Sequence, residues 1–354
     1  MEVMIMRPIR FPRDELAHGC NIEWWYFNGH LRDQLGRQYS YMHALFKADL
    51  EKLGFRMLSK TPLKTAYFTH SILTDIAAKK SYPLSNQIVM LSQDSFTKKQ
   101  LFINYINPFI VGGYTNYSID KPDKHAYHIK TEMLNLNMSS LKKPMLEGGK
   151  GFIDFGESRT YYYSLTRLKT RGHIKIGSRN LKVSGLSWMD HQWADMKNIK
   201  NSWNWFCMQL DNGADLVCFE YKEAGKKSVM ADIMSRNGRQ ENFRRVSIRP
   251  VGKPWKSPDT KVRYPLKWKI EIPEREISLA VSPQITKQEI VSGPFNYWEG
   301  PIDVRGSFSG KAVSGIGFME LVGRPCQHCR LLMLRRKFVE TLFDLGAKGE
   351  HSFY

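Results

Sequence analysis

The chain has 354 residues, of which 42% are hydrophobic and 25% charged, a composition that excludes a disordered polypeptide and a single small module. The formal net charge is +19, but the basic residues occur mainly as scattered doublets, which favours a solvated basic surface over a specific nucleic-acid site. No apolar run approaches the roughly 18 residues of a membrane-spanning helix, so the expected membrane interaction is limited to peripheral attraction to an anionic surface.

Most of the chain alternates apolar and polar residues with period two between turn residues, which predicts β-strands. Many short strands separated by Gly, Pro, Asn and Asp are typical of barrels or sandwiches. The expected strands are residues 22–31, 39–48, 66–73, 87–91, 161–168, 181–190, 203–210, 216–221, 268–272 and 314–322. A C-terminal amphipathic helix is predicted from apolar residues three or four positions apart, at Leu331, Leu334, Phe338, Leu342 and Leu345.

The dipeptide Asn212-Gly213 between two strand-like runs predicts a hairpin with a two-residue type I′ turn. This register places Cys207 opposite Cys218 in a hydrogen-bonded pair, where the Cα atoms stand farther apart than in the alternate pairs. Because the cysteine count of five is also odd, we interpret both as small buried hydrophobes rather than a disulfide. Cys326-x-x-Cys329 lacks a second cysteine pair at zinc-finger spacing. An incidental pair is therefore favoured, and a weak metal or redox site is the alternative.

An internal repeat relates the two halves of the chain. Residues 183–190 (VSGLSWMD) match residues 313–320 (VSGIGFME) at four of eight positions, with three further conservative pairs. The starts of the halves also correspond, because residues 24–27 (WWYF) parallel residues 203–206 (WNWF). A duplicated β unit is the simplest physical account, since each unit could close its own sheet and remove exposed edges.

The repeat predicts a boundary near residues 194–201. We therefore expect an N-terminal barrel domain over residues 1–197, a C-terminal barrel domain over residues 198–325 and a helical basic tail over residues 326–354. The sequence contains no G-x-S-x-G elbow, P-loop, G-x-G-x-x-G or H-E-x-x-H motif, which argues against the enzyme classes that these motifs mark. His30 and His43 have no ligand-like spacing, so neither a metal nor a cofactor is expected.

Two segments concentrate the candidate chemistry, EWWYFNGH from Glu23 onward and WMDHQW before residue 194. In a strand, Asp190 and His191 point to opposite faces and cannot form a dyad. If the Asp190 face lines a cavity, desolvation beside Trp188 would raise the pKa of Asp190 and hold it as a general acid. If the other face lines the cavity, the imidazole of His191 beside Trp193 is the candidate.

Glu23, on the same strand face as Trp25, is a second candidate acid. Structural alternatives remain open for each of these residues. Paired tryptophans at a strand start also plug barrel ends, and an aspartate there also serves as a hydrogen-bond acceptor. Glu320 occupies the place of Asp190 in the repeat, and both acids are not expected to be catalytic. His70 has a period-two neighbourhood and is equally compatible with a core histidine.

These motifs resemble the two-domain lipocalin-like family that includes bacterial carotenoid 1,2-hydratases, AttH-like attachment proteins and secreted hydrolases whose substrates are mostly unknown. The resemblance runs from about residue 11 to 323 and implies an all-β fold of two tandem lipocalin-like antiparallel barrels packed together. The motifs that carry it are EWWYFNG at 23–29, Tyr67-x-x-His70, YYYSLTRL at 161–168, G-x-x-WMDHQW at 185–193, WNWF at 203–206, YWEG at 297–300 and GIGFMELVG at 315–323.

The resemblance implies an apolar ligand, such as an isoprenoid, a lipid or a polyketide-like molecule. The hydratase branch adds water across a terminal isoprenoid double bond with a protonated aspartate, whose place in the motif matches Asp190. We therefore expect acid-assisted hydration or isomerisation of a C=C bond, a hydro-lyase type of reaction, with Asp190 and Glu23 as catalytic candidates. The alternative is a non-catalytic carrier or envelope accessory protein. Ligand contacts are expected from Trp24, Trp25, Tyr26, His70, Trp188, His191 and Trp193.

The first residues contain no 7–15-residue apolar stretch of the kind that marks a secretory signal, so the chain as given is expected in the cytoplasm, although relatives are often exported. Nothing in the sequence indicates an oligomeric state.

Overall fold

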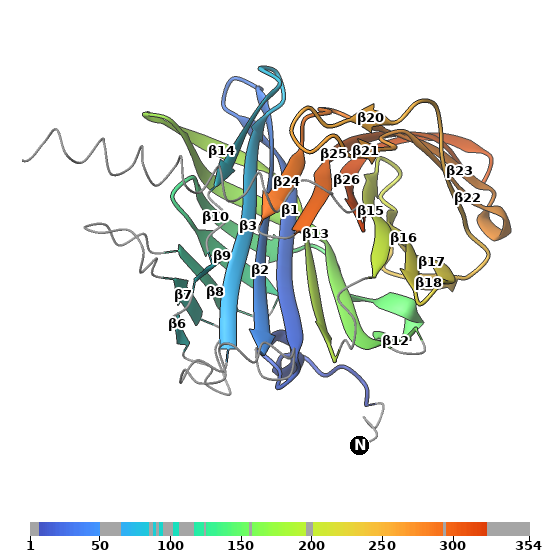
Figure 1. Cartoon of the computed structure of the whole chain (residues 1–354), viewed down its shortest axis with the longest axis horizontal. Helices are drawn as coiled ribbons and strands as arrows, with labels where there is room; N and C mark the ends of the chain where they lie inside the picture. The colour runs from blue at the N-terminus through green and yellow to red at the C-terminus, as the bar shows by residue number, and fades with distance from the viewer. Residues whose placement is uncertain are drawn as a thin grey trace, which may run out of the picture.

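The computed structural model of the chain (Figure 1) describes residues 7–49, 65–84, 88–89, 92–94, 102–105, 117–123, 125–155, 158–195, 201–292 and 295–323. Nearly all regular structure in these ranges is β, arranged as two curled antiparallel sheets. The remaining regular elements are short 3-10 turns: η1 (Arg13–Glu15), η3 (Glu147–Gly149) and η4 (Pro273–Arg275). The all-β prediction is confirmed.

The first sheet is built from the N-terminal half of the chain. Its described strands follow the order β4-β3-β2-β1-β14-β13-β10-β9-β8-β7-β6, with β5 beside β3 and β11 and β12 beside β13. Their bounds are β1 (Ile22–Asp33), β2 (Gln38–Asp49), β3 (Thr65–Asp75), β4 (Lys80–Leu84), β5 (Ile88–Val89), β6 (Ser92–Asp94), β7 (Phe102–Tyr105), β8 (Tyr117–Asp123), β9 (Ala126–Lys130), β10 (Leu134–Ser140), β11 (Met145–Leu146), β12 (Phe152–Asp154), β13 (Arg159–Ile176) and β14 (Arg179–Ala194).

The second sheet is built from the C-terminal half and repeats the same plan. Its described strands follow the order β18-β17-β16-β15-β26-β25-β23-β22-β19, with β24 beside β25, and β20 and β21 form a separate small pair. Their bounds are β15 (Ser202–Leu210), β16 (Asp215–Glu223), β17 (Lys226–Met234), β18 (Gln240–Phe243), β19 (Ser247–Pro250), β20 (Trp255–Lys256), β21 (Arg263–Tyr264), β22 (Trp268–Ile272), β23 (Ile277–Pro283), β24 (Glu289–Ser292), β25 (Phe295–Phe308) and β26 (Lys311–Val322).

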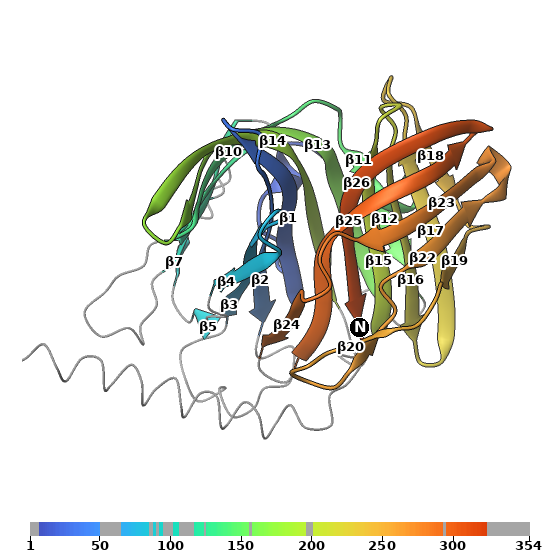
Figure 2. The same cartoon turned by 90° about the horizontal axis from the view of Figure 1, so that it is seen from above.

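The internal repeat is reproduced in the strand register. β14 and β26 each end their own sheet unit and lie between its first strand and the preceding strand. Tyr26 of β1 pairs with Asp190 of β14, and Trp205 of β15 pairs with Glu320 of β26. The two acids therefore occupy equivalent places in the two barrels, which lie side by side in Figure 2.

The hairpin prediction was wrong by one residue. Cys207 pairs with Val217 rather than with Cys218. The loop has three residues and ends in Gly213 at φ 85°, because a type I turn followed by a left-handed residue also joins twisted strands well. A one-residue slip turns the side chains of one strand to the opposite face. The two thiols consequently lie in different clusters and are free, as predicted, although for a different reason.

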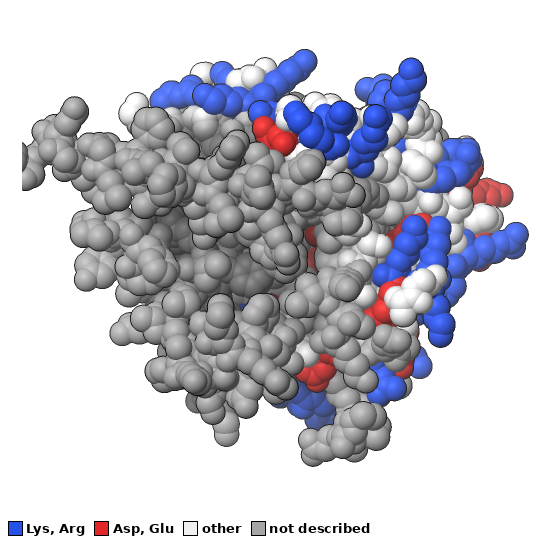
Figure 3. Space-filling model, in the orientation of Figure 1, with Lys and Arg blue, Asp and Glu red and all other residues white. Residues whose placement is uncertain are grey.

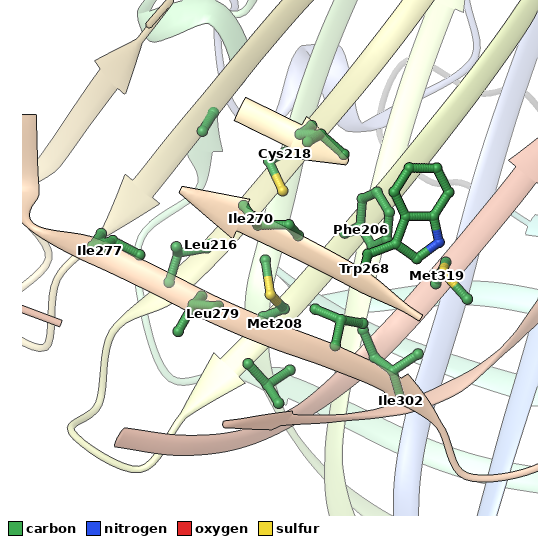
Figure 4. Close-up of a cluster of buried hydrophobic side chains, with 14 of the residues drawn as sticks. Phe206, Met208, Leu216, Cys218, Trp268, Ile270, Ile277, Leu279, Ile302 and Met319 are labelled. Atoms are coloured by element: carbon green, nitrogen blue, oxygen red, sulfur yellow. The ribbon is translucent and has the colours of Figure 1, made fainter. Parts of the chain in front are cut away.

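Three buried clusters hold the described fold together. One fills the N-terminal barrel and includes Trp25 and Phe27. A second fills the C-terminal barrel, where Phe206, Trp268 and their neighbours interdigitate (Figure 4). The third, which we call the inter-barrel cluster, joins the sheets through Tyr26, Met42, Ala44, Ile72, Met145, Ile153, Tyr162 and Trp188 from the first sheet and Trp205, Cys207, Val217, Phe219, Tyr221, Met230, Met234, Ile290, Tyr297 and Phe318 from the second. Strands β1, β14, β15 and β16 are thus buried on both faces.

The surface of the described residues is basic and mixed. On the face shown in Figure 3, Lys and Arg side chains are spread over the described surface with Asp and Glu among them. No helix in the part of the chain that the structure describes has the length and apolarity needed to cross a bilayer. The expected C-terminal helix, the basic tail over residues 326–354 and Cys326-x-x-Cys329 lie outside the described residues.

Candidate functional site

Strand alternation divides the predicted site residues between two places. Trp24, Tyr26, Trp188 and Asp190 face the inter-barrel cluster, because they occupy even positions of β1 and β14. The odd positions point into the N-terminal barrel and carry Glu23, Trp25, His191 and Trp193. His70 of β3 lies on the inter-barrel side, where its Nδ1 is hydrogen-bonded to the Tyr297 hydroxyl of the other barrel. The structure therefore brings together Asp190 and the first group, and it separates Glu23 from Asp190.

Asp190 is buried and surrounded by hydrogen-bond donors. Its Oδ1 accepts hydrogen bonds from the Ser164 hydroxyl and the Trp188 indole, both at 2.6 Å, and its Oδ2 accepts one from the Tyr162 hydroxyl at 2.7 Å. Burial raises the pKa of Asp190 to about 6, against the lowering effect of these three donors. The carboxyl therefore titrates close to neutral pH, as a general acid requires.

The Asp190 site extends into the second barrel. The Trp205 indole of β15 donates a hydrogen bond of 2.9 Å to the Tyr162 hydroxyl, which itself donates to Asp190. Tyr162 and Ser164 are positioned by β13, where Ser164 is the cross-strand partner of Asp190. Side chains from both barrels thus fix the orientation of the carboxyl.

Ser164 also links Asp190 to a second buried carboxyl. Its hydroxyl oxygen lies 2.6 Å from Oδ1 of Asp190 and 2.8 Å from Oε1 of Glu147. A serine hydroxyl has one hydrogen and can donate to only one of these oxygens. The other contact is a hydrogen bond only if that carboxyl carries a proton. The geometry therefore holds at least one proton on the Glu147–Asp190 pair, and burial raises the pKa of Glu147 well above its usual value.

Two further acids face the same cluster from the second barrel. Glu299 of β25 and Glu320 of β26 are cross-strand partners. Burial raises the pKa of Glu299 well above its ordinary range and that of Glu320 to about 8, and each is raised further by a neighbouring carboxylate. The Tyr26 hydroxyl faces Glu299, yet neither this hydroxyl nor Oε1 of Glu299 has a well-aligned hydrogen-bond partner among the described residues. We call Glu147, Asp190, Glu299 and Glu320 the acid cluster.

One edge of the inter-barrel cluster is partly open. Trp24 packs at this edge against Phe46, with ring centroids 6.4 Å apart, and Trp203 donates a hydrogen bond of 3.2 Å to Glu320. Trp24, Phe46, Trp203 and Glu320 are each partly exposed, whereas Asp190 is 3% exposed. Of the acid cluster, Glu320 therefore lies at this partly exposed edge among aromatic side chains, and Asp190 lies behind it.

Glu23 lies in a different electrostatic environment. Its Oε1 is 2.8 Å from Nδ1 of His18 and 2.8 Å from Nε2 of His191, and the Lys47 ammonium is 3.4 Å from its Oε2. The hydrogen bonds of both histidines outweigh burial and lower the pKa of Glu23 to about 2. Glu23 is therefore an ionised acceptor at neutral pH rather than a proton donor.

The histidines around Glu23 are held by aromatic rings. Trp193 stacks on His18 at 3.9 Å between ring centroids, and Trp25 stacks on His191 at 4.7 Å. His18, Glu23 and His191 present three potential metal ligands within 4.8 Å of one another. The two histidine hydrogen bonds and the lysine already balance the charge of the carboxylate, so the arrangement is complete as a hydrogen-bonded network.

Two hollows outlined by the described residues lie away from these clusters. One, of about 330 Å³, is lined by residues such as Met133 and His173, and the other, of about 600 Å³, by residues such as Arg32 and Asn137. Neither includes a residue of the predicted site. The predicted site residues therefore all lie outside these two hollows.

Several residues of the site were not predicted as such. Tyr162 and Ser164 stand in the YYYSLTRL motif, and Glu299 stands in the YWEG motif, so both motifs contained a signal. Ser164 and Glu299 occupy equivalent positions in the two barrels, because Ser164 is the cross-strand partner of Asp190 and Glu299 is the cross-strand partner of Glu320. Extending the internal repeat to these strands is the signal that could have found them. Glu147 lies in the short turn η3, and no sequence pattern marks it.

The fold and the site define a class of protein, a tandem pair of lipocalin-like barrels with buried acids where the barrels meet. Comparison with known families agrees with this description. The chain belongs to the AttH-like family, whose sequence model matches residues 2–324. The family predicted from the motifs is confirmed.

Individual relatives are more distant. The dehydratase asqC of Emericella nidulans is 22% identical over 202 residues, which are 53% of this chain and 57% of that protein, so the match spans little more than half of its length. A crystal structure from Nitrosomonas europaea that carries the name AttH has a TM-score of 0.74 at 23% identity and covers 92% of this chain and 99% of its own. The structure of kievitone hydratase from Nectria haematococca has a TM-score of 0.65 at 16% identity and covers 89% and 93%. These structural likenesses show the shared two-barrel fold.

Proposed function

We propose that this protein catalyses the addition of water to a C=C bond of an apolar small molecule, or the reverse elimination, at the inter-barrel acid cluster. The observation that carries the proposal is the Ser164 hydroxyl between Oδ1 of Asp190 and Oε1 of Glu147, which requires a proton on this buried pair. The names of two relatives, a dehydratase and a hydratase, support the reaction type. The aromatic surroundings favour an apolar substrate such as an isoprenoid or a polyketide-like molecule.

In the hydration direction, Asp190 acts as the general acid. Its carboxyl proton forms the new C–H bond with the π electrons of the alkene, which leaves a carbocation at the other carbon and a carboxylate on Asp190. The ring faces of Tyr26, Trp188 and Trp205 stabilise the cation. A water molecule then forms the C–O bond, and its proton passes to a carboxylate of the acid cluster. Elimination follows the same steps in reverse.

The other predicted residues have supporting roles in this proposal. Trp24, at the partly exposed edge, contacts the incoming substrate, and His70 helps to hold the two barrels together through Tyr297. Glu23, Trp25, His191 and Trp193 act at a distance by keeping the N-terminal barrel rigid behind Asp190.

An isotope experiment with a matched variant tests the proposal. Alkene-bearing isoprenoids and polyketide-like phenols are incubated in ¹⁸O-labelled water, and incorporation into the product is followed by mass spectrometry. For any substrate that is turned over, Asp190→Asn is expected to lower the rate roughly 100- to 10,000-fold. Glu223→Gln, a buried acid hydrogen-bonded to Ser158 and Asn201, serves as the control and should stay near wild type. Undiminished turnover by Asp190→Asn would contradict the acid role, and binding of apolar ligands without turnover would favour a carrier.

A further inference from the structure

A line of buried polar groups crosses the interface between the barrels. It runs from Asp190 of β14 through Ser164 of β13 and Glu147 of η3 to Asp232 of β17. We propose that this line is a proton relay, in which Glu147 beside Asp232 stores the proton that Ser164 passes to Asp190. The inference rests on the proposed function, because it assigns the source of the proton that Asp190 donates.

The relay is continuous and shielded. The two hydrogen-bond distances at Ser164 are 2.8 Å to Glu147 and 2.6 Å to Asp190, short enough for proton transfer without side-chain movement. Glu147, Ser164 and Asp232 are each fully buried, and Asp190 is 3% exposed. Because solvent does not reach the middle of this line, a proton that arrives at Ser164 comes from one of the two carboxyls.

The environment of Glu147 suits proton storage. Asp232 lies within hydrogen-bonding range of Glu147, and its own oxygens accept hydrogen bonds from the Gly148 amide at 2.8 Å and the Gln240 side chain at 3.2 Å. Oε2 of Glu147 is buried and has no donor among the described residues. Ionising two adjacent buried carboxyls together is costly. One proton is therefore shared between Glu147 and Asp232, and it supplies the donor that Oε2 of Glu147 otherwise lacks.

The groups facing Glu147 are otherwise neutral or acidic at neutral pH. Besides Asp232, they are Asp190 of β14 and Tyr162 and Ser164 of β13, while the Arg244 guanidinium approaches the neighbouring Gly148. Like-charged neighbours and burial both favour the protonated carboxyl, so the stored proton is retained above the pH at which Asp190 alone would lose its own.

The transfer is balanced in atoms and charge. After Asp190 has given its proton to the substrate, the Ser164 hydroxyl hydrogen moves to Oδ1 of Asp190 while the Glu147 proton moves to the Ser164 oxygen. The O–H bonds of Glu147 and Ser164 break, and new O–H bonds form on Ser164 and Asp190. Glu147 becomes the carboxylate and is reprotonated through Asp232, which neighbours the partly exposed side chains of Gln240 and Asn242.

The second barrel completes the store. The Gly148 amide donates to Asp232, and Gln240 pairs with the backbone of Leu146 through a hydrogen bond of 2.9 Å from the Leu146 amide. Gly148 makes its contact at φ 72°, a backbone conformation that glycine adopts without strain. Turn η3 is therefore held in place by β17 and β18. Docking of the two barrels brings Glu147 next to Asp232 and so keeps a proton on this pair, close to Asp190.

A first experiment counts protonated carboxyls without any substrate. Infrared spectra of the full chain, with and without ¹³C-labelled Asp and Glu, identify protonated carboxyls by their C=O stretch at pH 7.5. Because Glu299 and Glu320 also have raised pKa values, several buried carboxyls are expected to contribute to this band in wild type. Glu147→Gln should lose part of the band intensity and Glu223→Gln should keep all of it, with thermal unfolding used to confirm that each variant is folded. Unchanged band intensity in Glu147→Gln would overturn the store at Glu147, whatever the outcome of the turnover experiment.

A second experiment uses the pH–rate profile of Ser164→Ala. Loss of the Ser164 donor alone should raise the pKa of Asp190 and move the alkaline limb of the profile upward. With a relay, the limb instead moves downward, because Asp190 loses its internal proton supply, so that the rate at pH 8 falls at least about 10-fold while the rate at pH 5 is retained. An upward or absent shift would overturn the relay. If Asp190→Asn abolishes turnover while this shift is absent, the proposed function stands and the relay alone fails.

Discussion

Glu23 and Asp190 are two acids of the N-terminal barrel that are almost equally shielded from water, at 0% and 3% exposure, yet their pKa values lie far apart, at about 2 and about 6. Glu23 faces two histidines and a lysine. Asp190 faces neutral hydroxyl and indole donors and other carboxyls. The comparison shows that burial makes an ionised carboxylate costly at both sites. The neighbouring groups then decide whether the carboxyl stays ionised, as Glu23 does, or retains its proton near neutral pH, as Asp190 does.

Among substitutions that test this difference, Glu23→Gln is expected to have the largest effect, a loss in the free energy of unfolding. Glu23→Gln removes the charge that His18, His191 and Lys47 surround, and loss of one partner from a buried ionic network costs about 3–5 kcal/mol. The same substitution at Glu299, whose raised pKa keeps it protonated, is expected to change the free energy of unfolding by no more than about 1 kcal/mol. Urea denaturation at pH 7 measures both. Equal losses would show that the two regions do not differ in protonation.

The second effect is on the pH dependence of stability. The pKa of Glu23 is lowered from 4.5 to about 2, so its contribution is present above pH 4.5 and is lost as the pH falls toward 2. The pKa of Glu320 is raised from 4.5 to about 8, so its contribution is present below pH 4.5 and is lost as the pH rises toward 8.

Variants separate these two slopes. Glu23→Gln should flatten the stability curve between pH 2 and 4.5, and Glu320→Gln should flatten it between pH 4.5 and 8. Urea midpoints measured across this range for wild type and both variants provide the test. A steeper acid limb in Glu23→Gln, or an unchanged neutral limb in Glu320→Gln, would contradict the assignment of the two acids.

The smallest expected effect concerns single hydroxyls in the two regions. Tyr297→Phe removes the hydrogen bond to His70 across the barrels, and Tyr41→Phe removes one of 2.7 Å to Ser187 within the N-terminal barrel. Each should cost about 0.5–1.5 kcal/mol. Only Tyr297→Phe should also speed amide hydrogen exchange on both sides of the interface, while equal exchange in the two variants would argue against a docking role for the His70–Tyr297 pair.

Much of the fold could be predicted because its signals are local. Period-two alternation marks the strands, and it also separates Asp190 from His191, which face different clusters. The aromatic runs at residues 24–27 and 203–206 lie on strands that are buried on both faces. Such strands have no solvated side, so they carry apolar residues at consecutive positions, and this pattern is visible in the sequence. The hairpin register was missed because Asn212-Gly213 fits both a two-residue and a three-residue loop, and only packing on the two faces chooses between them.

The candidate site could be predicted only in part. Asp190 and Trp188 share a strand face, so their proximity follows from the sequence. Tyr162 and Ser164 reach Asp190 through strand pairing, and Glu147 reaches Ser164 through a turn held by the other barrel. These contacts join residues far apart in the chain, and no local pattern encodes them.

The amino-acid sequence by itself determined the β architecture, the duplication and the split of candidate residues between two strand faces, because side-chain periodicity and repetition are properties of neighbouring residues. Tertiary structure alone decided which face meets the second barrel and which acids keep their protons. Desolvation and the approach of distant partners set those protonation states, and both exist only once the two barrels have packed together.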